Sequence, residues 1–118
     1  MIRHIPNKYT LDSLVDEFGK DMRGKFDCLS LPIDYETKLN LGYAFINFTN
    51  PIHIVYFFSK FNLKSWSKFK SEKKMEICYA ERQGGKDLAL KADNIYFAAD
   101  DKRFDFKTFK PSIIIPNV

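Results

Sequence analysis

Cysteine is scarce in this chain of 118 residues, and the sequence has no long apolar run. The two cysteines and the two histidines stand at no spacing that would hold zinc. No apolar stretch approaches the roughly 20 residues that a membrane-spanning helix needs, and the chain opens on a strand-like segment rather than a signal peptide. These absences predict reduced thiols, no cofactor or metal, no membrane contact and an intracellular location in the nucleus, the cytoplasm or both.

Glycine, with five residues, is also rare, and the patterns of known catalytic sites are missing. A hydrolase of the acylphosphatase type needs an arginine in a glycine-rich phosphate-binding loop and an asparagine on a neighbouring strand. Asn47 would supply the amide, but the loop at residues 6–9 contains neither glycine nor arginine. The chain also lacks a Ser-His-Asp set, a carboxylate pair spaced for acid–base catalysis and a nucleotide-binding glycine loop. We therefore expect no enzyme activity.

Aromatic residues, in contrast, are abundant. The length suits one compact domain, and a hydrophobic content of 45% argues against disorder of the whole chain. The aromatic content of 16% is more than a small core needs, so some rings are expected on a surface or beneath a tail. The net charge of +4 permits a polyanionic partner without requiring one.

The order of the predicted elements indicates the fold class. Apolar periodicity predicts strands at residues 1–5, 26–33, 41–49 and 75–80, one helix after the capping residue Thr10 and a second helix after Asn50. This order contains two interleaved βαβ units. We therefore expect an α+β, ferredoxin-like βαββαβ fold, with a four-stranded antiparallel sheet, both helices on one face and the first and third strands at the centre.

The domain is expected to span residues 1–82, and residues 83–118 are expected to form a C-terminal extension. Gly84-Gly85 predicts a flexible joint, and residues 86–92 predict a short helix. Beyond it, Ile113-Ile114-Ile115 lies between prolines and is too apolar to be left in water. We therefore expect part of the tail to pack on the domain.

The segment LGYAFINF, residues 41–48, carries the clearest functional pattern. Side chains alternate along a strand, so Leu41, Tyr43, Phe45 and Asn47 share the face that the helices leave open. Two aromatic rings on an open sheet are suited to stacking on nucleic-acid bases. The segment resembles the octamer of the RNA recognition motif, [KR]-G-[FY]-[GA]-[FY]-V-x-[FY]. Leu41 departs from it, because the pattern has a cation there that would contact phosphate.

The first and fourth strands supply further candidates for RNA contact. Met1 stands where the first strand of the motif usually carries a stacking aromatic residue. Arg3 should share the open face with Tyr43 and reach a phosphate or a base, although a solvated arginine is an equal alternative. By analogy with the fourth strand of the motif, Cys78 and Arg82 should line the exit from the sheet.

Lysines surround the predicted fourth strand. Five of them lie at residues 64–74 against a single acidic residue in that stretch, Glu72. Such a run is usually a solvated surface, but its position next to the fourth strand favours electrostatic attraction of RNA. Lys74 and, beyond the strand, Lys86 are the candidates.

Longer segments carry features that are not general to RNA recognition motifs. They are IRHIPNKYT, LPIDYETKLNLGYAFINFTNP and WSKFKSEKKMEICYAERQGGK, and they cover about residues 2–91. Together they resemble the C-terminal RNA recognition motif of the Mei-two-like regulators of meiosis and development in fungi and plants. The resemblance implies a domain that binds single-stranded RNA, usually the last of several such motifs in a larger post-transcriptional or developmental regulator.

Some positions depart from the family pattern. His4 replaces an asparagine, Leu63 replaces a glycine, Glu81 replaces an arginine, and Glu76 would repel phosphate on the open face. With the aromatic second helix around residues 56–58, these departures leave an alternative. In it the motif is a scaffold for protein interaction through the second helix or the tail, with weak or no RNA binding.

Overall fold

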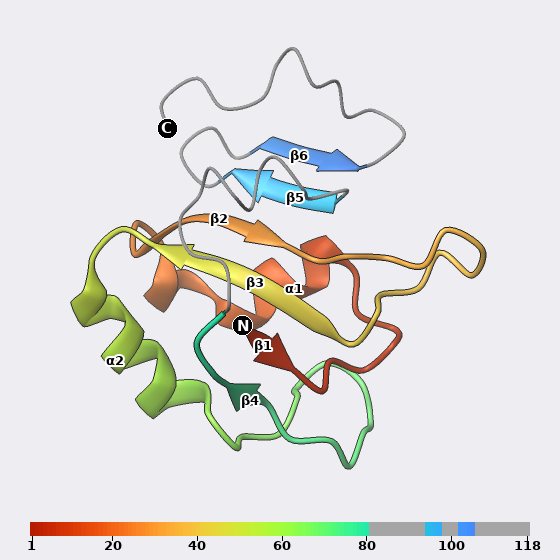
Figure 1. Cartoon of the computed structure of the whole chain (residues 1–118). Helices are drawn as coiled ribbons and strands as arrows, with labels where there is room; N and C mark the ends of the chain where they lie inside the picture. Colours follow the sequence, from red (N-terminus) through yellow and green to blue (C-terminus); the bar gives the residue numbers. More distant parts are fainter. Residues whose placement is uncertain (81–93, 98–101, 106–118) are drawn as a thin grey trace.

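The computed structural model describes residues 1–80, 94–97 and 102–105, and within them six strands form one antiparallel sheet (Figure 1). The elements are β1 (Ile2–Arg3), α1 (Leu11–Phe18), a 3-10 turn (Lys20–Met22), β2 (Phe26–Ser30), β3 (Tyr43–Phe48), α2 (Pro51–Phe61), β4 (Glu76–Ile77), β5 (Asn94–Phe97) and β6 (Lys102–Asp105). The strand order is β4-β1-β3-β2-β5-β6. The first four strands in this order, β4-β1-β3-β2, form the predicted ferredoxin-like sheet, so that prediction is confirmed.

The sheet is larger than the sequence predicted, because β5 and β6 add to the β2 edge. Leu29 of β2 lies opposite Tyr96 of β5, and Tyr96 lies opposite Arg103 of β6. The predicted short helix at residues 86–92 and the segment Ile113–Ile115 lie outside the described residues. The boundary between domain and extension stays a prediction.

Both helices begin at the residues that the sequence indicated. The Thr10 hydroxyl accepts a hydrogen bond from the Ser13 amide, and the Ser13 hydroxyl accepts one from the Thr10 amide, which makes a reciprocal cap. The Asn50 side chain accepts a hydrogen bond from the Ile52 amide, with Pro51 as the first residue of α2. These local signals set the residue at which each helix begins.

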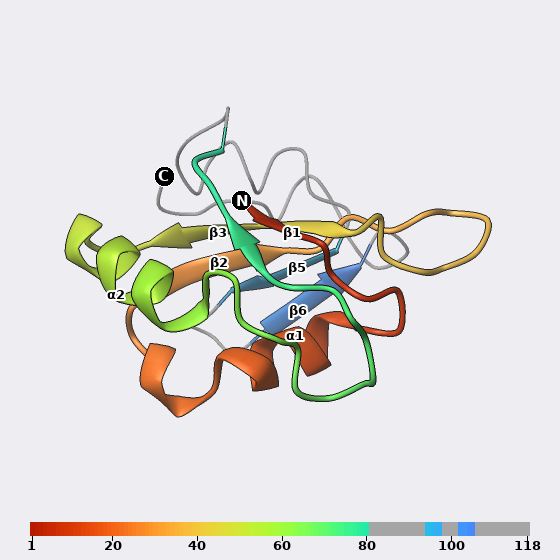
Figure 2. The ribbon, with the colours of Figure 1, turned by 90° about the horizontal axis from the view of Figure 1, so that it is seen from below.

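The two helices cover the same face of the sheet (Figure 2). Phe18 of α1 meets Phe57 of α2 edge-on, with their ring centroids 4.9 Å apart. Beneath these rings lie Ile2, Leu29 and Ala44, one from each of the three adjacent strands, and all three are fully buried. The other face therefore carries no helix among the described residues.

All four predicted strands are longer in the sequence pattern than in the structure. β1 ends at Arg3 because His4 adopts a left-handed φ of 64°. β3 begins at Tyr43, since Gly42 has a φ of 93°. A Cβ at Gly42 would meet nothing within 4 Å, so glycine serves the backbone conformation there and not close packing.

Tyr9 fixes the long α2–β4 connection against α1. Its ring is buried and meets the rings of Trp66 and Phe69 edge-on, at centroid distances of 4.9 and 5.2 Å. Its hydroxyl donates to Glu17 and accepts from the Lys68 amide at 3.1 Å. Burial, and next the Glu17 carboxylate, raise the pKa of Tyr9 to about 12. The role of Tyr9 is therefore to shape the fold.

Replacement of Tyr9 by phenylalanine is expected to lower the free energy of unfolding by about 1–3 kcal/mol, because the Lys68 amide and Glu17 lose a buried partner. Urea unfolding at pH 7 measures the loss, and Tyr79→Phe, at an 80% exposed position, is the control. Because the pKa of Tyr9 is raised from 10.0 to about 12, its stabilising contribution is complete below pH 10 and declines from pH 10 to 12. A difference between wild type and Tyr9→Phe that persists unchanged to pH 12 would contradict this assignment.

Candidate nucleic-acid interface

The open face of the sheet carries an aromatic pair on its central strand β3. Tyr43 and Phe45 are partly exposed, and their ring centroids lie 5.6 Å apart with the planes inclined by 76°. Between them, Ala44 points to the helix side and is fully buried. The alternation that the sequence predicted thus places both rings on the face without helices, where flat apolar ligands have access to them.

Arg3 lies directly beside this pair but is already bound to an acid. It pairs with Tyr43 on one side and with Glu76 on the other. Its Nη1 lies 3.4 Å from Glu76 Oε1, and His4 Nε2 lies 2.9 Å from Glu76 Oε2. Arg3 and Glu76 were both predicted on this face, but their contact was not. Its consequence is that a phosphate must compete with Glu76 for Arg3.

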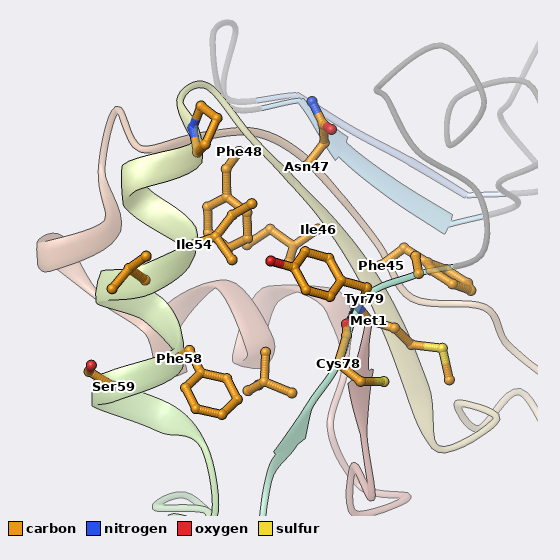
Figure 3. A pocket seen from close by; sticks show the side chains of 14 residues that line it. Met1, Phe45, Ile46, Asn47, Phe48, Ile54, Phe58, Ser59, Cys78 and Tyr79 are labelled. Atoms are coloured by element: carbon orange, nitrogen blue, oxygen red, sulfur yellow. Dashed lines mark hydrogen bonds between the residues drawn. The ribbon is translucent and has the colours of Figure 1, made fainter.

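Met1 and Cys78 form one edge of the aromatic platform. The Met1 amine donates to the Cys78 carbonyl at 2.7 Å, and the Cys78 amide donates to the Met1 carbonyl at 3.0 Å. Burial of the amine, which outweighs the attraction of Cys78, lowers its pKa. Both side chains line an apolar groove together with Phe45 (Figure 3). The structure thus brings together Met1, Cys78 and Phe45, as predicted.

The β2 side of this face is closed. Asn47 donates to both carboxylate oxygens of Asp27, at 3.0 and 3.2 Å, so its amide is engaged. Cys28 and Ser30 lie opposite Asn47 and Phe45, and Ile95 lies opposite Ser30, so all three belong to the open face by register. They are nevertheless at most 2% exposed. Burial, and next Asp27, raise the pKa of the Cys28 thiol to about 12. The accessible platform therefore consists of β4, β1 and β3.

The remaining predicted residues lie around or away from the platform. Leu41 is 48% exposed just before β3, and its amide donates to the Pro32 carbonyl. Lys74 is exposed, and its Nζ donates to the Ser65 hydroxyl at 2.6 Å. Arg82 and Lys86 lie outside the described residues.

The α2–β4 connection runs past α1 on the helix side of the sheet (Figure 2). The Ser67 hydroxyl donates to Glu17 of α1 at 2.8 Å, and Lys68 Nζ lies 3.8 Å from Asp16. The lysine run was predicted from its closeness to β4 in the sequence. In the structure the connection first passes α1, and Lys68 lies there beside Asp16.

Sequence reasoning missed two features of the site. One is His4, whose contact with Glu76 follows from the turn after β1. The other is the groove between β3 and α2, which has a volume of about 570 Å³. The residue that could have indicated this groove is Tyr79, an aromatic residue that continues the alternation of side chains after Ile77. Its side chain is 80% exposed.

In the described part of the chain, no three metal-ligating side chains gather at one place. Nor does any helix in that part reach the length and apolarity that a bilayer span requires.

Comparison with known proteins agrees with this geometry. A family model described as RNA recognition motif 2 matches residues 1–93. The chain is 46% identical over 103 residues to Protein MEI2-like 4 of Oryza sativa subsp. japonica, a match that covers 87% of this chain and 10% of that protein. It is 47% identical over 106 residues to Protein MEI2-like 2 of the same organism, covering 87% and 12% of the two chains.

A third relative, Protein MEI2-like 1 of Arabidopsis thaliana, is 46% identical over 103 residues, covering 87% of this chain and 11% of its own. The chain thus spans about a tenth of the length of these three relatives. The resemblance predicted from the sequence is confirmed. With its sheet order and its matches over most of its length, the chain belongs to the RNA recognition motif 2 family and is of the MEI2-like type.

Proposed function

We propose that this domain binds single-stranded RNA, with two bases stacked on Tyr43 and Phe45. The observation that carries the proposal is the pair of partly exposed rings on the sheet face opposite both helices. Stacking on an aromatic side chain contributes about 1–3 kcal/mol per base in single-strand binders. The family supports the proposal, because it is a family of RNA recognition motifs. The domain acts by binding, without catalysis, as one part of a larger post-transcriptional or developmental regulator.

The charged groups at the platform set a modest backbone affinity. Arg3 lies beside Tyr43 and is the nearest cation to the stacked bases, but Glu76 holds it at 3.4 Å. When a phosphate binds Arg3 in place of Glu76, the Glu76 carboxylate keeps its contact with His4. The lysines of the α2–β4 connection add attraction over a distance, which salt screens. Stacking therefore contributes more to the free energy of RNA binding than phosphate contacts do. The RNA affinity accordingly depends only moderately on salt concentration.

Replacement of both rings tests the stacking directly. Tyr43→Ala/Phe45→Ala is expected to weaken binding to a pool of short single-stranded RNAs by about 2 kcal/mol or more, which is roughly 30-fold. Fluorescence anisotropy at low and at physiological salt measures the change. Tyr56→Ala, on exposed α2, is the matched control and should bind as wild type does. Equal binding by wild type and double mutant, with a steep salt dependence, would leave only non-specific charge attraction.

Removal of the Glu76 charge is expected to strengthen RNA binding. In Glu76→Gln, Arg3 is free for phosphate, so affinity should rise about two- to fivefold at low salt. The slope of log K against log salt should steepen by about 0.7, which corresponds to one added phosphate contact on a single strand. Glu72→Gln makes the same change of net charge in the α2–β4 connection. If Glu76→Gln and Glu72→Gln raise the RNA affinity equally, the gain comes from net charge alone, and Arg3 does not contact phosphate.

Alkylation of the cysteines reports where RNA lies. Cys28 is buried and its thiol has a pKa of about 12, so it should stay unmodified by iodoacetamide at pH 8. Cys78, beside Phe45 in the groove, is less buried and should react first. Bound RNA should slow the reaction of Cys78 several-fold in wild type and not in Tyr43→Ala/Phe45→Ala, as mass spectrometry of the modified peptides can show. Faster or unchanged reaction with RNA would place the bases elsewhere.

A second candidate function is protein interaction on the same scaffold. The observation in its favour is the exposed apolar side of α2, where Ile52 and Val55 are 67% and 66% exposed. If RNA does not bind at physiological salt, this function takes precedence. The binding assay above therefore separates the two.

A further inference from the structure

Two basic side chains at the end of β1 share the carboxylate of Glu76. Arg3 Nη1 lies 3.4 Å from Glu76 Oε1, and His4 Nε2 lies 2.9 Å from Glu76 Oε2. The side chains of Arg3, His4 and Glu76 are 48%, 49% and 41% exposed. Ion pairs with this much exposure to water are weak, so a single added charge is enough to change which partner holds Glu76.

The backbone of His4 directs its ring to this carboxylate. In a regular strand, consecutive side chains point to opposite faces, so His4 would point away from Arg3 and toward the helices. β1 ends at Arg3, however, and His4 has a left-handed φ of 64°. This turn brings both side chains to Glu76. The conformation is uncommon outside glycine, and positions of this kind concentrate at functional sites.

The charges around His4 come from the three strands β3, β1 and β4, which lie side by side (Figure 1). The titratable side chains there are Arg3 of β1, Tyr43 of β3 and Glu76 of β4, and Lys74 just before β4 donates to Ser65. Of these residue types, histidine alone ordinarily changes its charge between about pH 5 and 8. Protonation of His4 therefore changes the net charge of the set Arg3, His4 and Glu76 from zero to +1.

We propose that His4 is a positioning residue for RNA binding, and that its protonated ring releases Arg3 from Glu76. The imidazolium takes over the ion pair with Glu76, and the Arg3 guanidinium becomes free for a phosphate beside Tyr43. When His4 is neutral, Arg3 remains the cation that pairs with Glu76. The inference rests on the proposed function, because it says when the cation next to the stacked bases is available to the RNA backbone.

The pH profile of RNA binding tests this proposal. The affinity of wild type for short single-stranded RNAs should rise about two- to fivefold from about pH 8 to about pH 5.5, since one phosphate contact is gained. His4→Asn should match wild type at pH 8 and lose the rise, because asparagine tolerates a left-handed φ and does not titrate. His53→Asn makes the same change at the other histidine, on α2, and should keep the wild-type profile. In Glu76→Gln the rise should be smaller, because Arg3 is already free at pH 8.

Nitrogen NMR of the free protein gives a second measurement that needs no RNA. In wild type, the Arg3 Nε resonance should shift over the same pH range as the ring nitrogens of His4. In His4→Asn and in Glu76→Gln it should stay constant, because the link through the carboxylate is missing. A purely structural role of His4 would produce no such coupled titration.

An equal rise of affinity in wild type and His4→Asn would overturn the proposal, as would an Arg3 resonance that does not follow His4. An undiminished rise in Glu76→Gln would also overturn it, because His4 would then attract phosphate directly and not through Glu76. Absence of RNA binding by wild type at both pH values would contradict the proposed function. The NMR titration would in that case still decide whether His4 releases Arg3.

Discussion

The alternation of side chains along β3 is the constraint on which the rest of the molecule depends. Its even positions supply Ala44 and Ile46 to the core beneath the helices, and its odd positions supply Tyr43 and Phe45 to the other face. A register shift of one residue would exchange these two sets and bury the rings while exposing the core. The same six-residue strand therefore serves both the core and the exposed aromatic pair on which the proposed function depends.

Much of this arrangement could be predicted because its signals are local. Thr10 and Asn50 start the helices through their own side chains, and Tyr43 and Phe45 are separated by one small residue. The contact of Arg3 with Glu76 could not be predicted, because it depends on register between strands 73 residues apart in sequence. β5 and β6 were missed for a related reason, since β5 pairs with the distant β2, β6 pairs with β5, and their sequence mixes charges with aromatic residues.

The position of the lysines shows how sequence proximity misleads. Lys68 precedes β4 by few residues, but the hydrogen bonds of Tyr9 and Ser67 hold that part of the connection against α1. Two cations of the chain thus lie in different layers. Arg3 lies at the platform in contact with Glu76, and Lys68 lies in the helix layer beside Asp16.

The double hydrogen bond between Met1 and Cys78 has a consequence for how the domain forms. It joins residues separated by 77 positions, and it holds β1, which lies between β3 and β4. Contacts between such distant residues require nearly the whole domain to close as one loop, which slows folding. During synthesis, β1 must therefore wait for β4 before the four-stranded part of the sheet can close, and the aromatic platform is complete only after residue 78 has emerged.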